Sequence, residues 1–192
     1  MKWAPLPFLC LTLVSPAAAQ DDVQIRMQTW SRALGVSCAS CHVPDAWADA
    51  SKPTFDFARR MSRMLDGLNE GPTQALGGSI SCWTCHRGQS RPARLPRPAW
   101  EQIRDTHEAD FASRPDRGLA MSVYSASLGV DCSHCHEPGN WTAAGKRPFA
   151  MVSKMDPIFG EIPKHFDESR SPSTQCYMCH QGQVRPERAQ PR

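Results

Sequence analysis

Cys38-Ala-Ser-Cys41-His42 is the stretch that decides the fold, because its pattern C-x-x-C-H occurs three more times in the 192 residues. The other copies are Cys82-Trp-Thr-Cys85-His86, Cys132-Ser-His-Cys135-His136 and Cys176-Tyr-Met-Cys179-His180. A chain of this composition would contain about 0.015 copies by chance. The motif is typical of c-type haem attachment, in which both sulfurs form thioethers to the haem and the adjacent His binds iron. The sequence therefore predicts four covalently bound haem c groups.

Other uses of these cysteines explain the pattern less well. Disulfides in an exported protein would account for an even number of cysteines, but not for a His after every second one. A zinc site would pair two C-x-x-C units around one metal ion and would not need that His. A thioredoxin-like redox motif should occur once, beside a βαβ pattern. Haem attachment remains the interpretation that uses every residue of the motif.

The first nineteen residues have the pattern of a secretory signal peptide. Lys2 supplies a positive start, residues 3–14 are mostly apolar, and Ala17-Ala18-Ala19 offers small residues for cleavage before Gln20. The apolar run is too short to span a bilayer, and no later stretch approaches the roughly 18 apolar residues that a spanning helix needs. We expect a periplasmic protein without a transmembrane segment. Cleavage would remove Cys10 and leave eight cysteines, all of them in the four motifs.

The chain is interpreted as a tandem duplication of a dihaem unit. The second pair of motifs follows the first at an offset of 94 residues, and aligning 26–92 with 120–186 gives 22 identities in 67 positions. Internal repeats of this kind define the architecture. The predicted organisation is a signal peptide at 1–19, a first dihaem repeat at 20–93, a Pro/Arg-rich linker with a helix at 94–117 and a second dihaem repeat at 118–192.

Hydrophobic periodicity predicts helices around the motifs. Apolar residues at helical spacing are Met27, Trp30 and Leu34; Met121, Tyr124 and Leu128; and Phe57, Met61, Met64, Leu65 and Leu68. Gly35 is placed to end the first helix, and Asp156-Pro157 is expected to interrupt the last one, because Pro lacks a backbone donor. No strand-like alternation stands out. The predicted fold is mainly α, with each repeat built as helix, haem, helix, haem and irregular loops.

Each iron needs a sixth ligand or stays open, and methionines at repeated positions are the candidates. Met27 and Met121 lie 11 residues before a first Cys, and Met61 and Met155 lie 21 residues before one. Methionine on a helix face is often only core filling, but both pairs recur across the repeat. The substitute for Met61 is Met64. His165 and His107 remain open as alternatives to Met155, whereas His134, between two motif cysteines, is expected to be exposed.

The chain resembles a known family in spacing as well as in residues. The stretches that carry the resemblance are Met27…Leu34-Gly35-Val36-x-Cys38-x-x-Cys41-His42, Lys52…Ala58-Arg59-x-Met61 and Cys82-Trp-Thr-Cys85-His86-Arg87-Gly88-Gln89. They are similar to the cytochrome subunit of photosynthetic reaction centres, over about 23–92 and again 118–186. The resemblance implies a tetrahaem electron donor to a photo-oxidised pigment pair, with Met ligands matching Met27, Met61 and Met121. The family's fourth haem takes a His from the first half, but 62–81 contain none, which favours Met155.

These observations predict a periplasmic tetrahaem c-type cytochrome that transfers single electrons between redox partners and is not an enzyme. Two alternatives remain: the donor subunit bound to a photosynthetic reaction centre, and a multihaem oxidoreductase with one open haem site. Expected partners are periplasmic or membrane-bound redox proteins, a reaction centre among them. The formal net charge of +3 does not indicate nucleic-acid binding, because the haem propionates would make the loaded protein negative.

Overall fold

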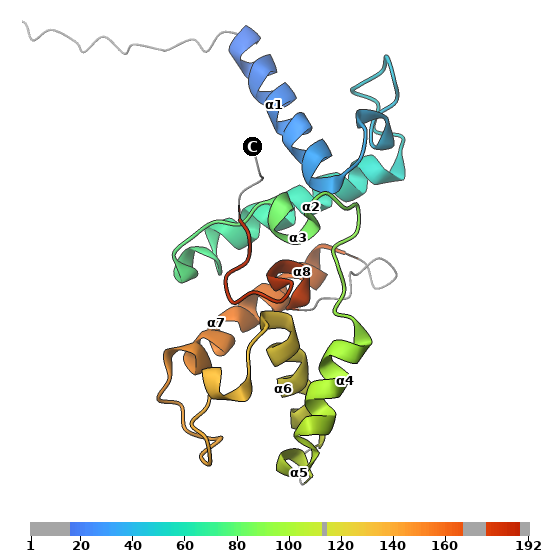
Figure 1. The fold of residues 1–192 in the computed structure, drawn as a ribbon. Coiled ribbons are helices and arrows are strands. Elements are labelled where there is room, and N and C mark those ends of the chain that lie inside the picture. The colour runs from blue at the N-terminus through green and yellow to red at the C-terminus, as the bar shows by residue number, and fades with distance from the viewer. Residues whose placement is uncertain (1–15, 113–114, 167–175, 189–192) are drawn as a thin grey trace, which may run out of the picture.

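The computed structural model describes residues 16–112, 115–166 and 176–188, and their regular structure is helical, as predicted (Figure 1). The α-helices are α1 (Pro16–Leu34), α2 (Pro53–Glu70), α3 (Cys82–His86), α4 (Arg97–Thr106), α5 (Glu108–Phe111), α6 (Pro115–Leu128), α7 (Arg147–Glu161) and α8 (Tyr177–His180). Short 3-10 helices are η1 (Cys38–Ser40), η2 (Gln74–Leu76), η3 (Cys132–His134) and η4 (Ile162–His165). Most of the predicted signal peptide, residues 1–15, lies outside the described residues; its last four residues begin α1.

The helix that precedes the first motif of each half ends directly before a glycine, as the sequence predicted for Gly35. α1 ends at Leu34 and α6 at Leu128. Gly35 and Gly129 follow with φ of +62° and +64°, the left-handed conformation that glycine adopts without steric cost. The chain thereby turns sharply away from each helix and enters the C-x-x-C-H segment three residues after the glycine.

The predicted interruption of the last long helix at Pro157 is wrong. α7 continues from Arg147 through Pro157 to Glu161. Pro157 lacks the N–H that would bond to the carbonyl of Ser153. Because Ser153 is exposed, water can satisfy that carbonyl, and the helix needs only one further turn before η4 begins. Local propensity is therefore overridden here by the packing of the segment that follows.

The two halves meet at residues that are equivalent in the repeat. Met64 and Leu68 of α2 are buried against Ile162 and Phe166, with Ile158 beside them. Leu68 and Ile162 are 94 residues apart, as are Met64 and Ile158. Phe57 extends the contact, its ring centroid lying 5.1 Å from that of Phe166. The central packing surface is thus formed by α2 from one half and by α7 and η4 from the other.

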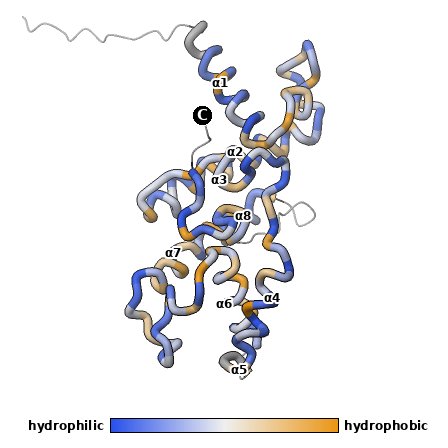
Figure 2. Tube along the Cα trace, viewed as in Figure 1, coloured by the Kyte–Doolittle hydropathy of each residue, from blue (hydrophilic) through white to orange (hydrophobic). Residues whose placement is uncertain are grey.

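Protein side chains alone make only a small core. In the part of the chain that the structure describes, the buried apolar residues are Ala33, Met64, Leu68, Ile162, Phe166 and Met178. Figure 2 shows apolar residues scattered along the chain trace rather than gathered in one layer. A chain of this size normally buries a larger set of apolar side chains. Large apolar groups inserted between the helices would supply the missing core.

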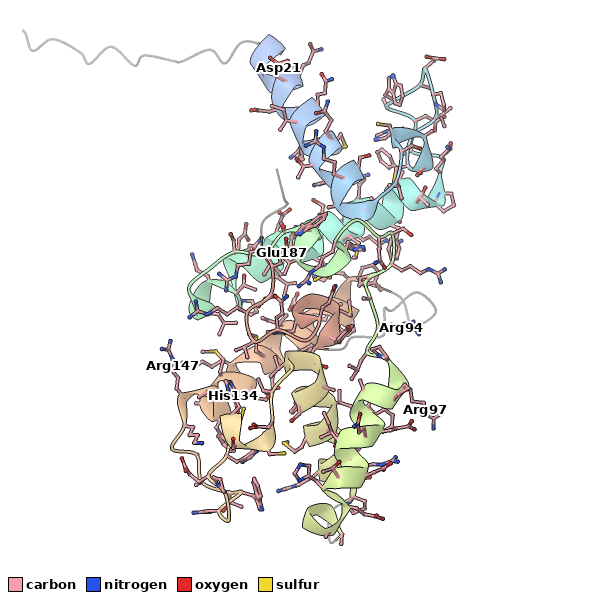
Figure 3. All side chains as sticks on the ribbon, in the orientation of Figure 1. Asp21, Arg94, Arg97, His134, Arg147 and Glu187 are labelled. Carbon is pink, nitrogen blue, oxygen red and sulfur yellow. The ribbon has the colours of Figure 1, made fainter. Side chains whose placement is uncertain are left out.

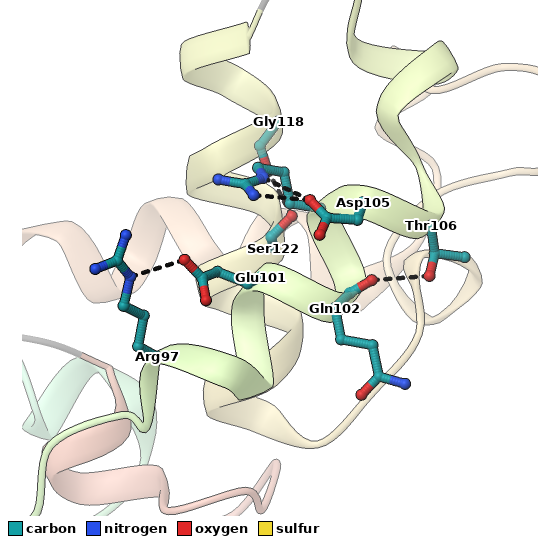
Figure 4. Close-up of polar contacts among 8 residues, drawn as sticks. Arg97, Glu101, Gln102, Asp105, Thr106, Gly118 and Ser122 are labelled. Atoms are coloured by element: carbon teal, nitrogen blue, oxygen red, sulfur yellow. Dashed lines mark hydrogen bonds and ion pairs between the residues drawn. The ribbon is translucent and has the colours of Figure 1, made fainter.

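The linker predicted at 94–117 contains α4 and α5 and packs against α6 at one end of the molecule (Figure 1). Ion pairs on α4 join Arg97 to Glu101 at 2.7 Å and Arg104 to Asp105 at 2.8 Å (Figure 4). At the opposite end α1 projects from the body, with Asp21 on its outer part (Figure 3). The second half therefore carries a helical cover, formed by α4 and α5, that has no counterpart in the sequence of the first half.

Candidate haem sites

The first motif of each half is surrounded by the same aromatic side chains. The ring of His42 lies 5.3 Å from Phe55 and 6.1 Å from Trp47, both edge to face. In the second half the ring of His136 lies 5.3 Å from Phe149 and 6.0 Å from Trp141. Phe55 and Phe149 lie near the start of α2 and α7, so each helix start holds a motif histidine in place. The tryptophans remain 55% and 41% exposed, so one side of each ring faces solvent.

A lysine also ties each of these helices to its motif. Lys52 Nζ donates to the carbonyl of Ala39 at 2.5 Å, and Lys146 Nζ donates to the carbonyl of Ser133 at 2.5 Å. Both acceptors are the residue directly after the first motif cysteine. The two lysines occupy equivalent positions in the aligned repeats, but their bond to the motif was not predicted from the sequence. The signal was their repetition at the same distance from the motif.

The second motif of each half forms a short helix followed by a tight turn. Arg87 and Gln181 follow α3 and α8 in the left-handed conformation, both with φ of 46° and ψ of 48°. Gly88 and Gly182 continue the turn with φ of +80° and +79°. The turn brings the next carbonyl back to the motif histidine. The repeated string H-x-G-Q therefore encodes a local structure that fixes the orientation of a histidine ring.

The same turn receives the end of the helix that precedes the first motif. Gly88 N–H donates to the carbonyl of Ala33 at 2.8 Å, and Gly182 N–H donates to the carbonyl of Ser127 at 2.9 Å. A Cβ on Gly35 would overlap the carbonyl oxygen of Gly88, so glycine is required for this approach. Each half thus joins its two motifs through one close backbone contact.

The second motifs of the two halves face one another at the centre of the molecule. Helix α3 packs against α8, and the sulfurs of Cys85 and Cys179, which are equivalent in the repeat, are 2.6 Å apart. Arg87 crosses this contact: its Nη2 donates to the carbonyl of Cys179 at 2.9 Å, and its Nε lies 4.0 Å from the carboxylate of Glu187. The Arg87 side chain is only 14% exposed. The equivalent residue in the second half, Gln181, is neutral. The positive charge of Arg87 therefore makes the two halves differ at this contact.

The histidine hydrogen bonds are those expected of iron ligands. Nδ1 of His42 lies 2.7 Å from the carbonyl of Trp47, and Nδ1 of His86 and of His180 lies 2.9 Å from the carbonyls of Gln89 and Gln183. A carbonyl accepts the Nδ1 proton and leaves Nε2 unprotonated, the state that binds a metal. Burial lowers the pKa of His86 and His180, which also favours the neutral ring. Nδ1 of His136 is buried without a hydrogen-bond partner.

A cavity of about 560 Å³ lies around the third motif. Its lining includes Cys132, Cys135 and His136 of the motif together with Met121 and Tyr124 of α6. This volume is within the range of cofactor pockets. The two cysteines and the histidine of this motif, together with the methionine predicted as the distal ligand, therefore line one space. The residues fit a c-type haem.

The other methionines predicted as distal ligands lie in different surroundings. Met27 of α1 is half-buried. Met61 packs against the central core. Asp156, next to Met155 on α7, and Cys176 of the fourth motif both raise the pKa of Tyr124, after burial, so both lie near Tyr124. Met64 is buried in the core.

The spare histidines lie at three different places. His107, an alternative ligand for the fourth haem, lines the cavity around the third motif, and its Nε2 lies 3.8 Å from the sulfur of Cys132. His165 is next to the core residue Phe166, and its Nε2 lies 3.1 Å from the carboxylate of Glu161. His134 is half-buried, so the expectation that it would be exposed is wrong. Its backbone N–H donates to the carboxylate of Asp131 at 3.1 Å.

Burial raises the pKa of four motif thiols, whereas the hydrogen bond with Cys85 lowers the pKa of Cys179. Burial raises the pKa of Cys82 and raises the pKa of Cys176 to about 11. Burial also raises the pKa of Cys41 and Cys135. Because the thiolate is the reactive form, these thiols are poor nucleophiles.

Paired cysteines with an adjacent, correctly hydrogen-bonded histidine define the class of c-type cytochromes. A sequence model of the photosynthetic reaction centre cytochrome c subunit family matches residues 20–117, half of the chain. The chain belongs to this family. The photosynthetic reaction center cytochrome c subunit of Rubrivivax gelatinosus is 25% identical over 78% of this chain, and that of Thermochromatium tepidum is 26% identical over 74% of it.

The chain spans only part of the length of these relatives. It covers 58% of the Rubrivivax protein and 36% of the Thermochromatium protein. Among the helices that the structure describes, none is both long and apolar enough to cross a membrane.

Proposed function

We propose that this protein is a periplasmic tetrahaem cytochrome c that delivers single electrons to a photosynthetic reaction centre. The observation that carries the proposal is the meeting of equivalent C-x-x-C-H motifs at Cys85 and Cys179, within a chain that belongs to a family of reaction-centre cytochromes. Each bound haem would supply a one-electron Fe(III)/Fe(II) couple. The protein's task is to hold four such groups close together with fixed ligands.

The helix contacts support one order of the haems in space. Helix α1, which leads into the first motif, packs against α3, which carries the second. Helix α3 packs against α8, which carries the fourth motif, and α8 packs against α6, which leads into the third. The proposed row is therefore first, second, fourth, third. The first and third haems form its ends, beside the exposed rings of Trp47 and Trp141.

The ligands proposed for these haems are a histidine and a methionine in each case. His42, His86, His136 and His180 bind on the proximal side through Nε2. Met27, Met61, Met121 and Met155 bind on the distal side, and Met/His ligation raises the potential relative to other ligand pairs. Filled distal positions leave no open iron, which supports an electron carrier over an oxidoreductase.

The proposal is tested with holoprotein matured in a periplasm and mixed with reaction centres that lack their own cytochrome. After a laser flash, the pigment pair should be re-reduced faster as the cytochrome concentration rises. With the third haem facing the pigment pair, a variant lacking the second haem, Cys82→Ala with Cys85→Ala, should deliver only two electrons, from the third and fourth haems, because the first haem is cut off from the row. A variant lacking the first, Cys38→Ala with Cys41→Ala, is the matched control and should lose only one electron of capacity. Re-reduction at a rate independent of the cytochrome would overturn the proposal of a reaction-centre partner.

A further inference from the structure

The linker brings a histidine into the cavity around the third motif. His107 lies between α4 and α5, with a backbone φ of −112° that ends one helix and begins the other. Helix α4 packs against α6, the helix that carries Met121. His107 is half-buried there. Neither repeat contains this residue, because the linker has no equivalent in the alignment of the two halves.

His107 shares its cavity with every group expected to hold the third haem. The space of about 560 Å³ is lined by His107 together with Met121, Cys132, Cys135 and His136. Nε2 of His107 lies 3.8 Å from the sulfur of Cys132, which is an attachment point of the ring. The imidazole is therefore held at the edge of this cavity, next to one of the attachment cysteines, and it directly follows α4, which packs against the helix of Met121.

We propose that His107 is a second distal-side ligand of the third haem site, able to bind the iron through Nε2 in place of the Met121 sulfur. The inference rests on the proposed function, in which Met121 is the resident ligand. Imidazole and thioether are both neutral donors, so exchange moves no charge and needs no co-reactant. Replacing Met/His by His/His ligation lowers a haem potential. The third haem would thus have one reduction potential with Met121 bound and a lower one with His107 bound. The first haem, at the other end of the row, would have only one.

The first half supplies a matched control for this inference. Met27 occupies the position of Met121, and Trp47, Phe55 and His42 repeat the surroundings of the proximal ring. No linker helix covers that site in the described part of the chain, and the structure places His107 at the other end of the molecule. Removing Met27 should therefore leave an iron without a protein ligand to replace it.

The experiment compares Met121→Ala with Met27→Ala in the four-haem holoprotein. Electron paramagnetic resonance and near-infrared magnetic circular dichroism count high-spin haems and distinguish His/His from Met/His ligation. Met27→Ala should contain one high-spin haem. Met121→Ala should stay fully low-spin, with one His/His haem of lowered potential, and Met121→Ala combined with His107→Ala should regain one high-spin haem. Mass spectrometry of each variant confirms that all four haems are attached.

Two results would overturn the inference. One is a high-spin haem in Met121→Ala that matches the one in Met27→Ala. The other is a His/His signal that persists when His107 is also removed. Neither result would contradict the proposed function as an electron carrier. The proposed Met ligation fails separately, if Met121→Ala leaves the spectrum of the native protein unchanged.

Discussion

Replacing Gly35 with alanine should destabilise the protein far more than replacing another glycine that has a similar backbone conformation. At Gly35, φ is +62°, and an alanine held in the left-handed region costs about 1–2 kcal/mol. The new Cβ would also overlap the carbonyl of Gly88, whose carbon lies 2.8 Å away. Moving the two backbone segments apart would break the 2.8 Å hydrogen bond from Gly88 N–H to the carbonyl of the fully buried Ala33. An unsatisfied buried carbonyl costs about 1–3 kcal/mol more.

Gly77→Ala is the control, because Gly77 has φ of +74° but a Cβ there would meet nothing within 4 Å. The predicted losses in free energy of unfolding are about 2–5 kcal/mol for Gly35→Ala and about 1–2 kcal/mol for Gly77→Ala. Guanidinium unfolding of the holoprotein, followed by circular dichroism, measures both. Gly129→Ala should behave like Gly35→Ala, since its Cβ would meet Gly182 in the same way. Equal losses for Gly35→Ala and Gly77→Ala would refute the backbone contact between the two motifs.

Three further predictions follow from the centre of the molecule. Arg87→Gln, which introduces the residue found at the equivalent position of the second half, should lower the reduction potential of a central haem by roughly 50–100 mV in a redox titration. The reason is that a charge ~10 Å away interacts with ~1.7 kcal/mol at an effective dielectric constant of ~20. An unchanged potential would contradict this prediction. Leu68→Ala, at a side chain 1% exposed, should cost about 2–5 kcal/mol of unfolding free energy, and a loss under about 1 kcal/mol would argue against the core between the halves. Pro157→Ala should stabilise the holoprotein against guanidinium by up to about 3 kcal/mol, whereas no change would place Pro157 outside the helix.

The sequence predicted the local features of the fold well. Helix ends at Leu34 and Leu128 follow from the glycine after each one, since a left-handed residue both ends a helix and suits few other side chains. Lys52-Pro53 marks the start of α2 for a similar reason, because Pro is favoured in the first turn. Such signals act between neighbouring residues and can be interpreted without knowing the fold.

Long-range contacts could not be predicted in the same way. The meeting of Cys85 with Cys179 depends on how two helical halves pack, and nothing local to either motif specifies it. The placement of His107 beside the third motif has the same origin, in the packing of α4 on α6. At Pro157 a strong local signal gave the wrong prediction. The helix continues through the proline because its end packs into the core around Ile162.

The role of the lysines lies between these cases. Lys52 and Lys146 bond to carbonyls 13 residues earlier, a contact that no helix or turn rule describes. Their repetition at one distance from each motif was visible in the sequence, but periodicity gave no reason to connect them with a backbone acceptor. Internal repetition therefore identified positions that matter, whereas their partners required the structure.

Ligand typing of the oxidised holoprotein tests the central claim most directly. Near-infrared magnetic circular dichroism with electron paramagnetic resonance should show four low-spin haems, each with a histidine and a methionine as axial ligands. That result would match an electron carrier built on His42, His86, His136 and His180. A high-spin haem that quickly binds cyanide or peroxide would contradict it, because an open iron is what a multihaem oxidoreductase needs.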